Sequence, residues 1–218
     1  MSQKRRLFII GASYFARELE SWLDLIPEVD RDWSLCGFLH TPLQISPLAG
    51  YPTDLAIVGD WENFNFRSDD YVVLGVSDPA WKERIWSMLH GRVSFFTYVA
   101  PNVTLGKYNS IGKGSIICPN CVVTTNVKVG KFVTINNSTN IGHDVLIKDF
   151  ASIMGHVTLT GRVRVGSLAY IGAAATVIPN KNIGDGATVG AGSVVIRNVS
   201  NNVTVFGNPA KPIKYQGV

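Results

Sequence analysis

The sequence predicts two domains: a small Rossmann-like α/β domain, followed by an all-β parallel β-helix. Two observations support this prediction. Strand-like and helix-like segments alternate in the N-terminal part, and an aliphatic residue recurs every six positions in the C-terminal part. We expect the α/β domain over residues 1–95, the β-helix over residues 96–200 and a C-terminal tail over residues 201–218.

The N-terminal segment has the pattern of a doubly wound sheet. A buried strand is expected at residues 7–10, an amphipathic helix follows it up to residue 26, and further strands are expected at residues 33–39 and 71–76. Residues 78–90 have the apolar spacing of a second helix. Strand, helix and strand in this order predict a small α/β domain with a parallel sheet.

The turn after the first strand contains a single glycine, Gly11, followed by Ala12 and Ser13. Such a turn can bind a phosphate through its backbone N–H groups. It lacks the three glycines of a dinucleotide fingerprint, and His40-Thr41 stand where an NAD site needs an acid. A mononucleotide or nucleotide-sugar site is therefore favoured, and a purely structural cap on the β-helix is the alternative.

The six-residue period organises the rest of the chain. Steps of six from Val99 reach Val, Ile or Leu at all seventeen positions, the last of which is Val195. This period fits neither the 3.6 residues per turn of an α-helix nor the alternation of a long strand. It is typical of short strands separated by turns, with three strands in each coil. Chance periodicity in an ordinary β-sandwich would not keep this register, so we predict a β-helix.

Two histidines lie within the predicted β-helix. His143 follows the inward-facing Ile141 by two residues, so we expect it at a turn and pointing outward, next to Asp144. A carboxylate beside an imidazole can select one tautomer and increase its basicity, which suits a general base. The alternative is a surface histidine with a chance acidic neighbour, but the polar run at residues 136–140 favours the chemical role. His156 has no acidic neighbour, and we expect it to be structural.

Composition excludes several functional classes. A net charge of +4, without a basic run longer than three residues, gives little reason to expect binding to nucleic acid. Three cysteines, an odd number, argue against a disulfide framework and favour a reducing, cytoplasmic compartment. No segment stays apolar over the about 20 residues that a membrane span needs, so we expect no membrane association.

The sequence does not predict a metal site. Cys118 and Cys121 form one Cys-Pro-Asn-Cys pair, and Cys36 cannot complete a four-cysteine zinc site. A catalytic zinc usually takes three protein ligands, whereas the β-helix offers two histidines.

Three segments resemble a known family: FIIGASYFARE near the N-terminus, NIGHD in the β-helix and VFGNPAKPI near the C-terminus. Together they look like the hexapeptide-repeat sugar O/N-acyltransferases of sialic-acid and bacillosamine biosynthesis, over essentially the whole chain. The resemblance implies a left-handed β-helix, a homotrimer, and acetyl-CoA bound between neighbouring rods. It also implies that a nucleotide-linked amino sugar, such as a 4-amino-4,6-dideoxy sugar, is N-acetylated for a surface glycan such as lipopolysaccharide.

The resemblance further implies roles for individual residues. His143 would be the general base, and Asp144 would orient it. The acetyl-CoA site would comprise Ser152, Gly161, Ala173 and Ala191, with the Gly161 N–H facing the thioester carbonyl. The nucleotide sugar would be held by Gly11, Ala12, Ser13, His40 and Gly75.

Three positions depart from the family pattern. Ser152 stands where a second histidine is frequent, Ser13-Tyr14-Phe15 replaces small glycines, and His40-Thr41 replaces an acidic pair. They leave open the nucleotide, the sugar and the acyl group. The alternatives to N-acetylation are O-acetylation of a sialic acid or another sugar hydroxyl, and a non-catalytic scaffold that binds a nucleotide sugar.

Overall fold

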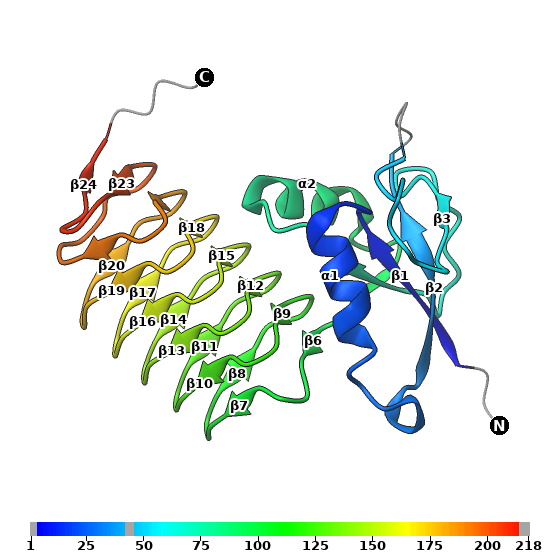
Figure 1. Cartoon of the computed structure of the whole chain (residues 1–218), viewed down its shortest axis with the longest axis horizontal. Coiled ribbons are helices and arrows are strands. Elements are labelled where there is room, and N and C mark those ends of the chain that lie inside the picture. Colours follow the sequence, from blue (N-terminus) through cyan, green and yellow to red (C-terminus); the bar gives the residue numbers. More distant parts are fainter. Residues whose placement is uncertain (1–3, 42–45, 214–218) are drawn as a thin grey trace. The chain divides into compact units, whose positions relative to one another are not determined.

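The computed structural model describes residues 4–41 and 46–213. The chain forms two compact units, which Figure 1 shows. The first comprises Met1–Ser77 and Trp81–Thr97, and the second comprises Asp78–Ala80 and Tyr98–Val218. The chain leaves the first unit at residue 97, two residues after the end that we expect from the sequence.

The first unit is built on a five-stranded sheet in the order β3–β2–β1–β4–β5, with parallel pairing throughout. The strands are β1 (Arg5–Ile10), β2 (Trp33–Leu39), β3 (Ile57–Gly59), β4 (Tyr71–Leu74) and β5 (Ser94–Phe95). The helices are α1 (Tyr14–Leu23), α2 (Pro79–Leu89) and a 3-10 turn, η1 (Glu28–Asp30). The three predicted strands and both predicted helices are confirmed, whereas the short β3 and β5 were not predicted.

The order of the strands creates a special position beside the central β1. The chain runs from β1 to β2 and β3 on one side of the sheet, and to β4 and β5 on the other. Open parallel sheets bind ligands at the carboxyl ends of the two strands where this direction changes. In this sheet those strands are β1 and β4.

The second unit is a solenoid of two-residue strands that recur every six residues, and each strand pairs in parallel with the strand 18 residues away. Sheet I contains β7 (Thr104–Leu105), β10 (Val122–Val123), β13 (Asn140–Ile141), β16 (Thr158–Leu159), β19 (Thr176–Val177) and β22 (Val194–Val195). Sheet II contains β8 (Ser110–Ile111), β11 (Lys128–Val129), β14 (Leu146–Ile147), β17 (Arg164–Val165) and β20 (Asn182–Ile183). Sheet III contains β6 (Tyr98–Val99), β9 (Ile116–Ile117), β12 (Thr134–Ile135), β15 (Ser152–Ile153), β18 (Tyr170–Ile171), β21 (Thr188–Val189), β23 (Thr204–Phe206) and β24 (Lys211–Pro212). The predicted β-helix is confirmed, and its left-handedness stays a prediction.

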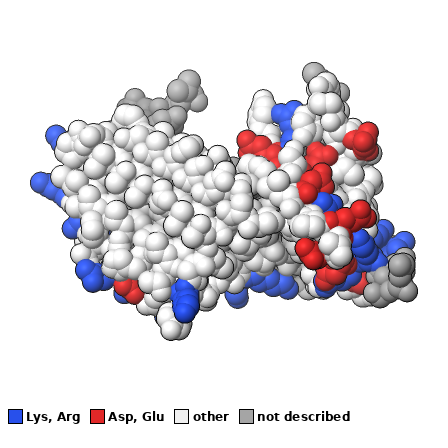
Figure 2. Space-filling model, turned by 60° about the horizontal axis from the view of Figure 1, so that its bottom comes forward, with Lys and Arg blue, Asp and Glu red and all other residues white. Residues whose placement is uncertain are grey.

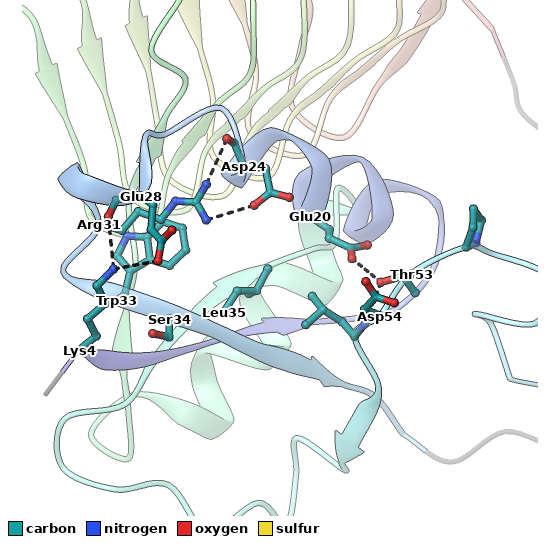
Figure 3. Close-up of a pocket in the computed structure, with 12 residues that line it drawn as sticks. Lys4, Glu20, Asp24, Glu28, Arg31, Trp33, Ser34, Leu35, Thr53 and Asp54 are labelled. Atoms are coloured by element: carbon teal, nitrogen blue, oxygen red, sulfur yellow. Dashed lines mark hydrogen bonds and ion pairs between the residues drawn. The ribbon is translucent and has the colours of Figure 1, made fainter.

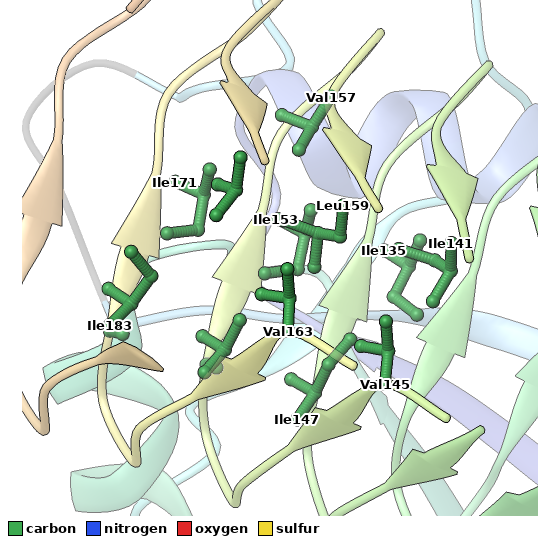
Figure 4. Close-up of a cluster of buried hydrophobic side chains, with 14 of the residues drawn as sticks. Ile135, Ile141, Val145, Ile147, Ile153, Val157, Leu159, Val163, Ile171 and Ile183 are labelled. Atoms are coloured by element: carbon green, nitrogen blue, oxygen red, sulfur yellow. The ribbon is translucent and has the colours of Figure 1, made fainter. Parts of the chain in front are cut away.

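The six-residue period builds the core of the solenoid. From Ile117 onward every aliphatic residue of the period is buried, and Figure 4 shows several of these side chains stacked between the sheets. The first three, Val99, Leu105 and Ile111, remain partly exposed because their coil has a neighbour on one side only. Each buried side chain of this kind contributes about 1.5–3 kcal/mol before the chain entropy is subtracted.

The solenoid extends into the segment that we expect from the sequence to be a tail. β23 pairs in parallel with β21, and β24 returns antiparallel along β23. Val205 of β23 is buried and belongs to the same core. As far as the structure describes it, the segment from residue 201 onward therefore closes the end of sheet III.

The turns between strands use a left-handed residue that the sequence analysis did not predict. A residue with positive φ stands three positions after most of the periodic aliphatic residues. Asn and Gly often fill this position, as in Asn120, Asn126, Asn180, Gly114 and Gly186. These are the residue types that tolerate a left-handed backbone, so their recurrence was the available signal.

We expect Ile153→Ala to lower the free energy of unfolding by about 2–5 kcal/mol, because the substitution leaves a cavity in a column of packed side chains. Ile153 is fully buried, whereas Ile213 is 44% exposed and provides the matched control. Ile213→Ala should change the stability by less than about 0.5 kcal/mol. Urea unfolding followed by circular dichroism measures both, and equal losses would contradict the packing described.

Candidate active site

His143 lies in the turn between β13 of sheet I and β14 of sheet II. Its side chain is 54% exposed, as we expect for a residue at a turn. Asp144 takes the left-handed position of this turn, with φ of 59°. The His143 Nδ1 lies 2.8 Å from the Asp144 Oδ2. The two neighbours in sequence therefore form a hydrogen-bonded pair at the surface of the solenoid.

Stacking of the coils completes the surroundings of Asp144. Turns that repeat every 18 residues lie on one another, and we call this stack of turns between sheets I and II the histidine corner. Asn126, one coil earlier, donates from Nδ2 to the Asp144 Oδ1 at 2.6 Å. Arg162 lies one coil later, and its backbone N–H donates to the carbonyl of His143. The sequence analysis missed Asn126, although its distance of 18 residues from Asp144 was a usable signal.

The charge state of the pair follows from these contacts. The hydrogen bonds from His143 and Asn126, together with the Arg162 cation, hold the pKa of the Asp144 carboxyl below its ordinary value. An ionised carboxylate is an acceptor only, so the His143 Nδ1 must carry a proton in this contact. The Nε2 of the neutral ring then holds the free lone pair, and it makes no hydrogen bond to any described residue.

Gly161 lies directly beside the imidazole. A Cβ at this glycine would stand 2.4 Å from the His143 Nε2, so any side chain would displace the ring. Gly161 is buried, and its N–H donates to no acceptor among the described residues. At comparable turns, Asp149 caps the N–H of Lys131 from the next coil. The residue in that position for Gly161 is Pro179, which has no side-chain acceptor. Buried N–H groups without a partner are rare, so this one is available to a ligand.

The other residues expected to bind acetyl-CoA lie elsewhere on the solenoid. Ala173 and Ala191 are exposed and stand one coil apart in the stack of turns between sheets III and I, which we call the alanine corner. His156 occupies the same corner. Ser152 belongs to β15, and its side chain is fully buried. Within one chain, only Gly161 of the expected set lies beside His143.

The residues expected to hold the nucleotide sugar gather at the carboxyl ends of three neighbouring strands. Gly11 follows β1 with φ of +96°, Gly75 follows β4, and His40 follows β2. A Cβ on Gly11 would lie 3.1 Å from the carbonyl oxygen of Gly75, and a Cβ on Gly75 would lie 2.6 Å from that of Ala16 in α1. Glycine is therefore required at residue 75 for α1 to pack closely on the sheet. Gly11 and Gly75 thus lie at the position where the strand order changes direction.

Ala12 and Ser13 connect this position to α1. Ala12 is fully buried, so it can offer only its backbone to a ligand. Ser13 is the N-cap residue of α1, and its hydroxyl makes no capping hydrogen bond. The five predicted substrate residues therefore share one end of the sheet.

A cavity of about 430 Å³ lies at the opposite, amino end of the sheet, where β2 begins. Figure 3 shows that its charged side chains face one another. Arg31 pairs with Asp24 at 3.2 Å, Lys4 contacts Glu28 at 3.8 Å, and the Thr53 hydroxyl donates to Glu20. None of the residues predicted to bind a ligand lines this cavity, and its charges are used in internal pairs.

The described part of the chain contains no group of three or more His, Cys, Asp and Glu side chains close enough to bind a metal ion. In the same residues, no helix has the length and apolar character to cross a membrane. Cys118 and Cys121 are buried, free thiols in the solenoid.

Comparison with known proteins gives structural matches only: no protein-family model matches the chain, and no curated protein matches it by sequence. The acetyltransferase domain of PglB from Neisseria gonorrhoeae, in complex with acetyl coenzyme A, superposes with a TM-score of 0.84 at 25% identity, covering 97% of this chain and 100% of that one. WeeI from Acinetobacter baumannii gives a TM-score of 0.82 at 25% identity, covering 96% and 100%. PerB from Caulobacter crescentus, in complex with CoA and GDP-perosamine, gives 0.84 at 21% identity, covering 95% and 97%.

These matches extend over both units of the chain, because each covers at least 95% of it. The structural neighbours are acyl-CoA-dependent sugar N-acetyltransferases that share the β-helix fold. The resemblance seen in the sequence is thereby confirmed: this chain has the fold of the hexapeptide-repeat sugar N-acetyltransferases.

Proposed function

We propose that this protein is an acetyl-CoA-dependent N-acetyltransferase that acts on the amino group of a nucleotide-linked amino sugar. The observation that carries this proposal is the His143–Asp144 pair, whose free Nε2 lies beside the buried, unpartnered N–H of Gly161. A base and an oxyanion donor side by side are the two groups that acyl transfer from a thioester needs. The structural neighbours bound to acetyl-CoA or CoA support the same reaction.

The reaction would be a direct transfer between two bound substrates. The amine nitrogen attacks the thioester carbonyl, and the Nε2 of His143 accepts the proton that the amine loses. Asp144 stabilises the imidazolium that forms, and the Gly161 N–H stabilises the negative charge on the carbonyl oxygen. When the C–S bond breaks, the imidazolium returns its proton to the leaving thiolate of CoA. Because the thioester is already activated, no Ser or Cys nucleophile is needed.

The proposed enzyme is a homotrimer, and the distribution of charge on the solenoid supports assembly through sheet I. The six hexapeptides that carry this sheet contain no Lys, Arg, Asp or Glu, whereas each of the five that carry sheet II contains at least one. Figure 2 shows a broad face of the solenoid with almost no charged side chain, and Lys and Arg along its margins. Uncharged surface is the kind that protein interfaces bury at their centres.

Assembly would also complete the site. The histidine corner and the alanine corner border sheet I on opposite sides, so one chain does not bring them together. A second copy packed on sheet I would place its alanine corner near the His143 of the first. Ala173 and Ala191 would then line a channel for the pantetheine arm, because their small side chains leave room for it.

The first unit would hold the nucleotide part of the substrate as a small Rossmann-like domain. The support is the position of Gly11 and Gly75 at the carboxyl ends of β1 and β4, where parallel sheets bind nucleotides. Free thiols and the use of acetyl-CoA both suit a cytoplasmic enzyme that makes a precursor of a surface glycan.

We expect His143→Ala to lower kcat by about 10²–10⁴-fold, which is the usual contribution of a general base. Asp144→Asn should cost less, because it removes the charge and keeps a hydrogen bond. A coupled assay for free CoA thiol, with acetyl-CoA and a panel of nucleotide-linked amino sugars, measures both. Near-normal turnover in His143→Ala would remove the proposed base, and failure of the wild-type protein to bind acetyl-CoA in isothermal titration would favour the scaffold.

We expect Asn126→Ala to lower kcat about tenfold, or about 1.4 kcal/mol, because Asp144 loses the contact that fixes its carboxylate. Asn126→Asp should move the acidic limb of the profile of kcat/KM against pH upward, since an added negative charge favours the protonated imidazole. Asn120 is the matched control: it has the same backbone conformation, but its side chain binds Asn102. An equal loss in Asn120→Ala would show that the effect is structural.

We expect Thr176→Glu, in β19 of sheet I, to dissociate the trimer, because the new carboxylate would be buried without a partner. Asn182→Glu, in β20 of sheet II, is the control and should leave the assembly unchanged. Light scattering coupled to size-exclusion chromatography measures the mass of both variants. A monomeric wild-type protein, or a Thr176→Glu variant that remains a trimer, would contradict the proposed interface.

A further inference from the structure

Arg17 occupies an unusual position on the outer side of α1. Its Cζ lies 5.0 Å from the ring centroid of Tyr14 and 4.9 Å from that of Tyr51. Both distances are within the range of cation–π contacts, so two aromatic rings hold one guanidinium group. Tyr14 precedes Arg17 by one turn of α1, and Tyr51 lies in the segment between β2 and β3.

The guanidinium group of Arg17 has no anionic partner among the described residues. It forms no hydrogen bond or ion pair with residues 4–41 or 46–213. Other arginines of the same unit do pair with carboxylates: Arg6 with Asp70 at 2.6 Å, and Arg31 with Asp24 at 3.2 Å. Arg17 is also partly buried, so its donors are held in place and are not dispersed into solvent. A fixed guanidinium with free donors is suited to a planar or tetrahedral oxyanion.

The position of Arg17 relates it to the end of the sheet where Gly11 and Gly75 meet. Its backbone N–H donates to the carbonyl of Ser13 at 3.1 Å, so one helical turn separates it from the turn after β1. Tyr14 is the first residue of α1 and its side chain is 80% exposed. The ring of Tyr14 is therefore accessible to a second flat group such as a nucleobase.

The link between Tyr51 and α1 does not account for the guanidinium. The Tyr51 hydroxyl donates to the backbone carbonyl of Arg17 at 3.3 Å, and this contact needs no particular side chain at residue 17. A residue with an aliphatic side chain would fill the space beside the two rings equally well. The charge and the five donors of arginine remain without a structural role.

We propose that Arg17, Tyr14 and Tyr51 form the subsite for the nucleoside diphosphate group of the substrate. Arg17 binds a phosphate with its free N–H donors, Tyr51 and Tyr14 hold the guanidinium in place, and Tyr14 offers its exposed ring to the base. This inference rests on the proposed function, and it assigns to Tyr14 and Arg17 the contacts that the replaced family residues would otherwise make.

Isothermal titration of the full-length protein with UDP, GDP, dTDP and CoA tests the subsite. We expect the wild-type protein to bind at least one nucleoside diphosphate, and Arg17→Gln to weaken that binding about tenfold or more, because a charge-assisted contact is lost. Tyr14→Ala should weaken it about fivefold or more through the loss of stacking. The affinity for CoA should stay unchanged in both variants. Arg17→Gln keeps the aliphatic part of the side chain, and a thermal melt checks that it folds.

Arg84→Gln is the matched control, because Arg84 lies 4.9 Å from the Trp81 ring on α2 in a contact of the same kind. It should bind all four ligands like the wild-type protein. The inference is overturned if Arg17→Gln binds nucleoside diphosphates normally, if Arg84→Gln loses as much affinity, or if no nucleoside diphosphate binds. Loss of CoA affinity in Arg17→Gln would overturn it as well, because the phosphate would then belong to CoA. Binding of acetyl-CoA and the requirement for His143 are measured separately, so this inference can fail while the proposed function stands.

Discussion

Parallel pairing between strands 18 residues apart is the constraint on which the rest of the solenoid depends. Each residue lies directly against its equivalent in the next coil, and backbone hydrogen bonds join the coils at the strands and at the turns. The aliphatic residues then form continuous columns, and even the turns stack, as the rings of Phe132 and Phe150 do at 5.3 Å. A shift of register by one residue would bring polar side chains into these columns, so the periodic sequence specifies the register strongly.

The candidate active site is a consequence of the same stacking. Asn126, Asp144 and Arg162 are far apart in sequence terms but occupy equivalent positions in three successive coils. The turn needs a left-handed residue, and Asp is among the few non-glycine types that adopt this conformation readily. The backbone requirement of the turn and the chemical requirement of the imidazole are therefore met by one residue. The absence of a side chain at Gly161 then leaves room for the ring and exposes an N–H beside it.

The faces of the solenoid divide the tasks that the proposed function requires. Sheet I carries no charged residue, sheet II carries mostly cations, and the histidine corner lies on the border between them. A neutral face can be buried against another copy at little electrostatic cost, whereas a cationic face attracts the phosphates of nucleotides and of CoA. A base placed at the border is therefore near both a potential interface and an attractive surface for anionic substrates.

The sequence by itself determined the β-helix, because a column of stacked side chains demands one aliphatic residue at every sixth position, and it also determined the central strands and helices of the first unit. It singled out His143 and Asp144 because they are neighbours in the chain. The short edge strands β3 and β5 could not be predicted, since two or three residues carry no period. Only the tertiary structure decided that Asn126 holds Asp144, that Gly161 lies against the imidazole, and that Ala173 and Ala191 lie at another corner. Those relations depend on which turns stack in space, and a one-dimensional pattern fixes the number of residues per coil without fixing where a side chain of the next coil reaches.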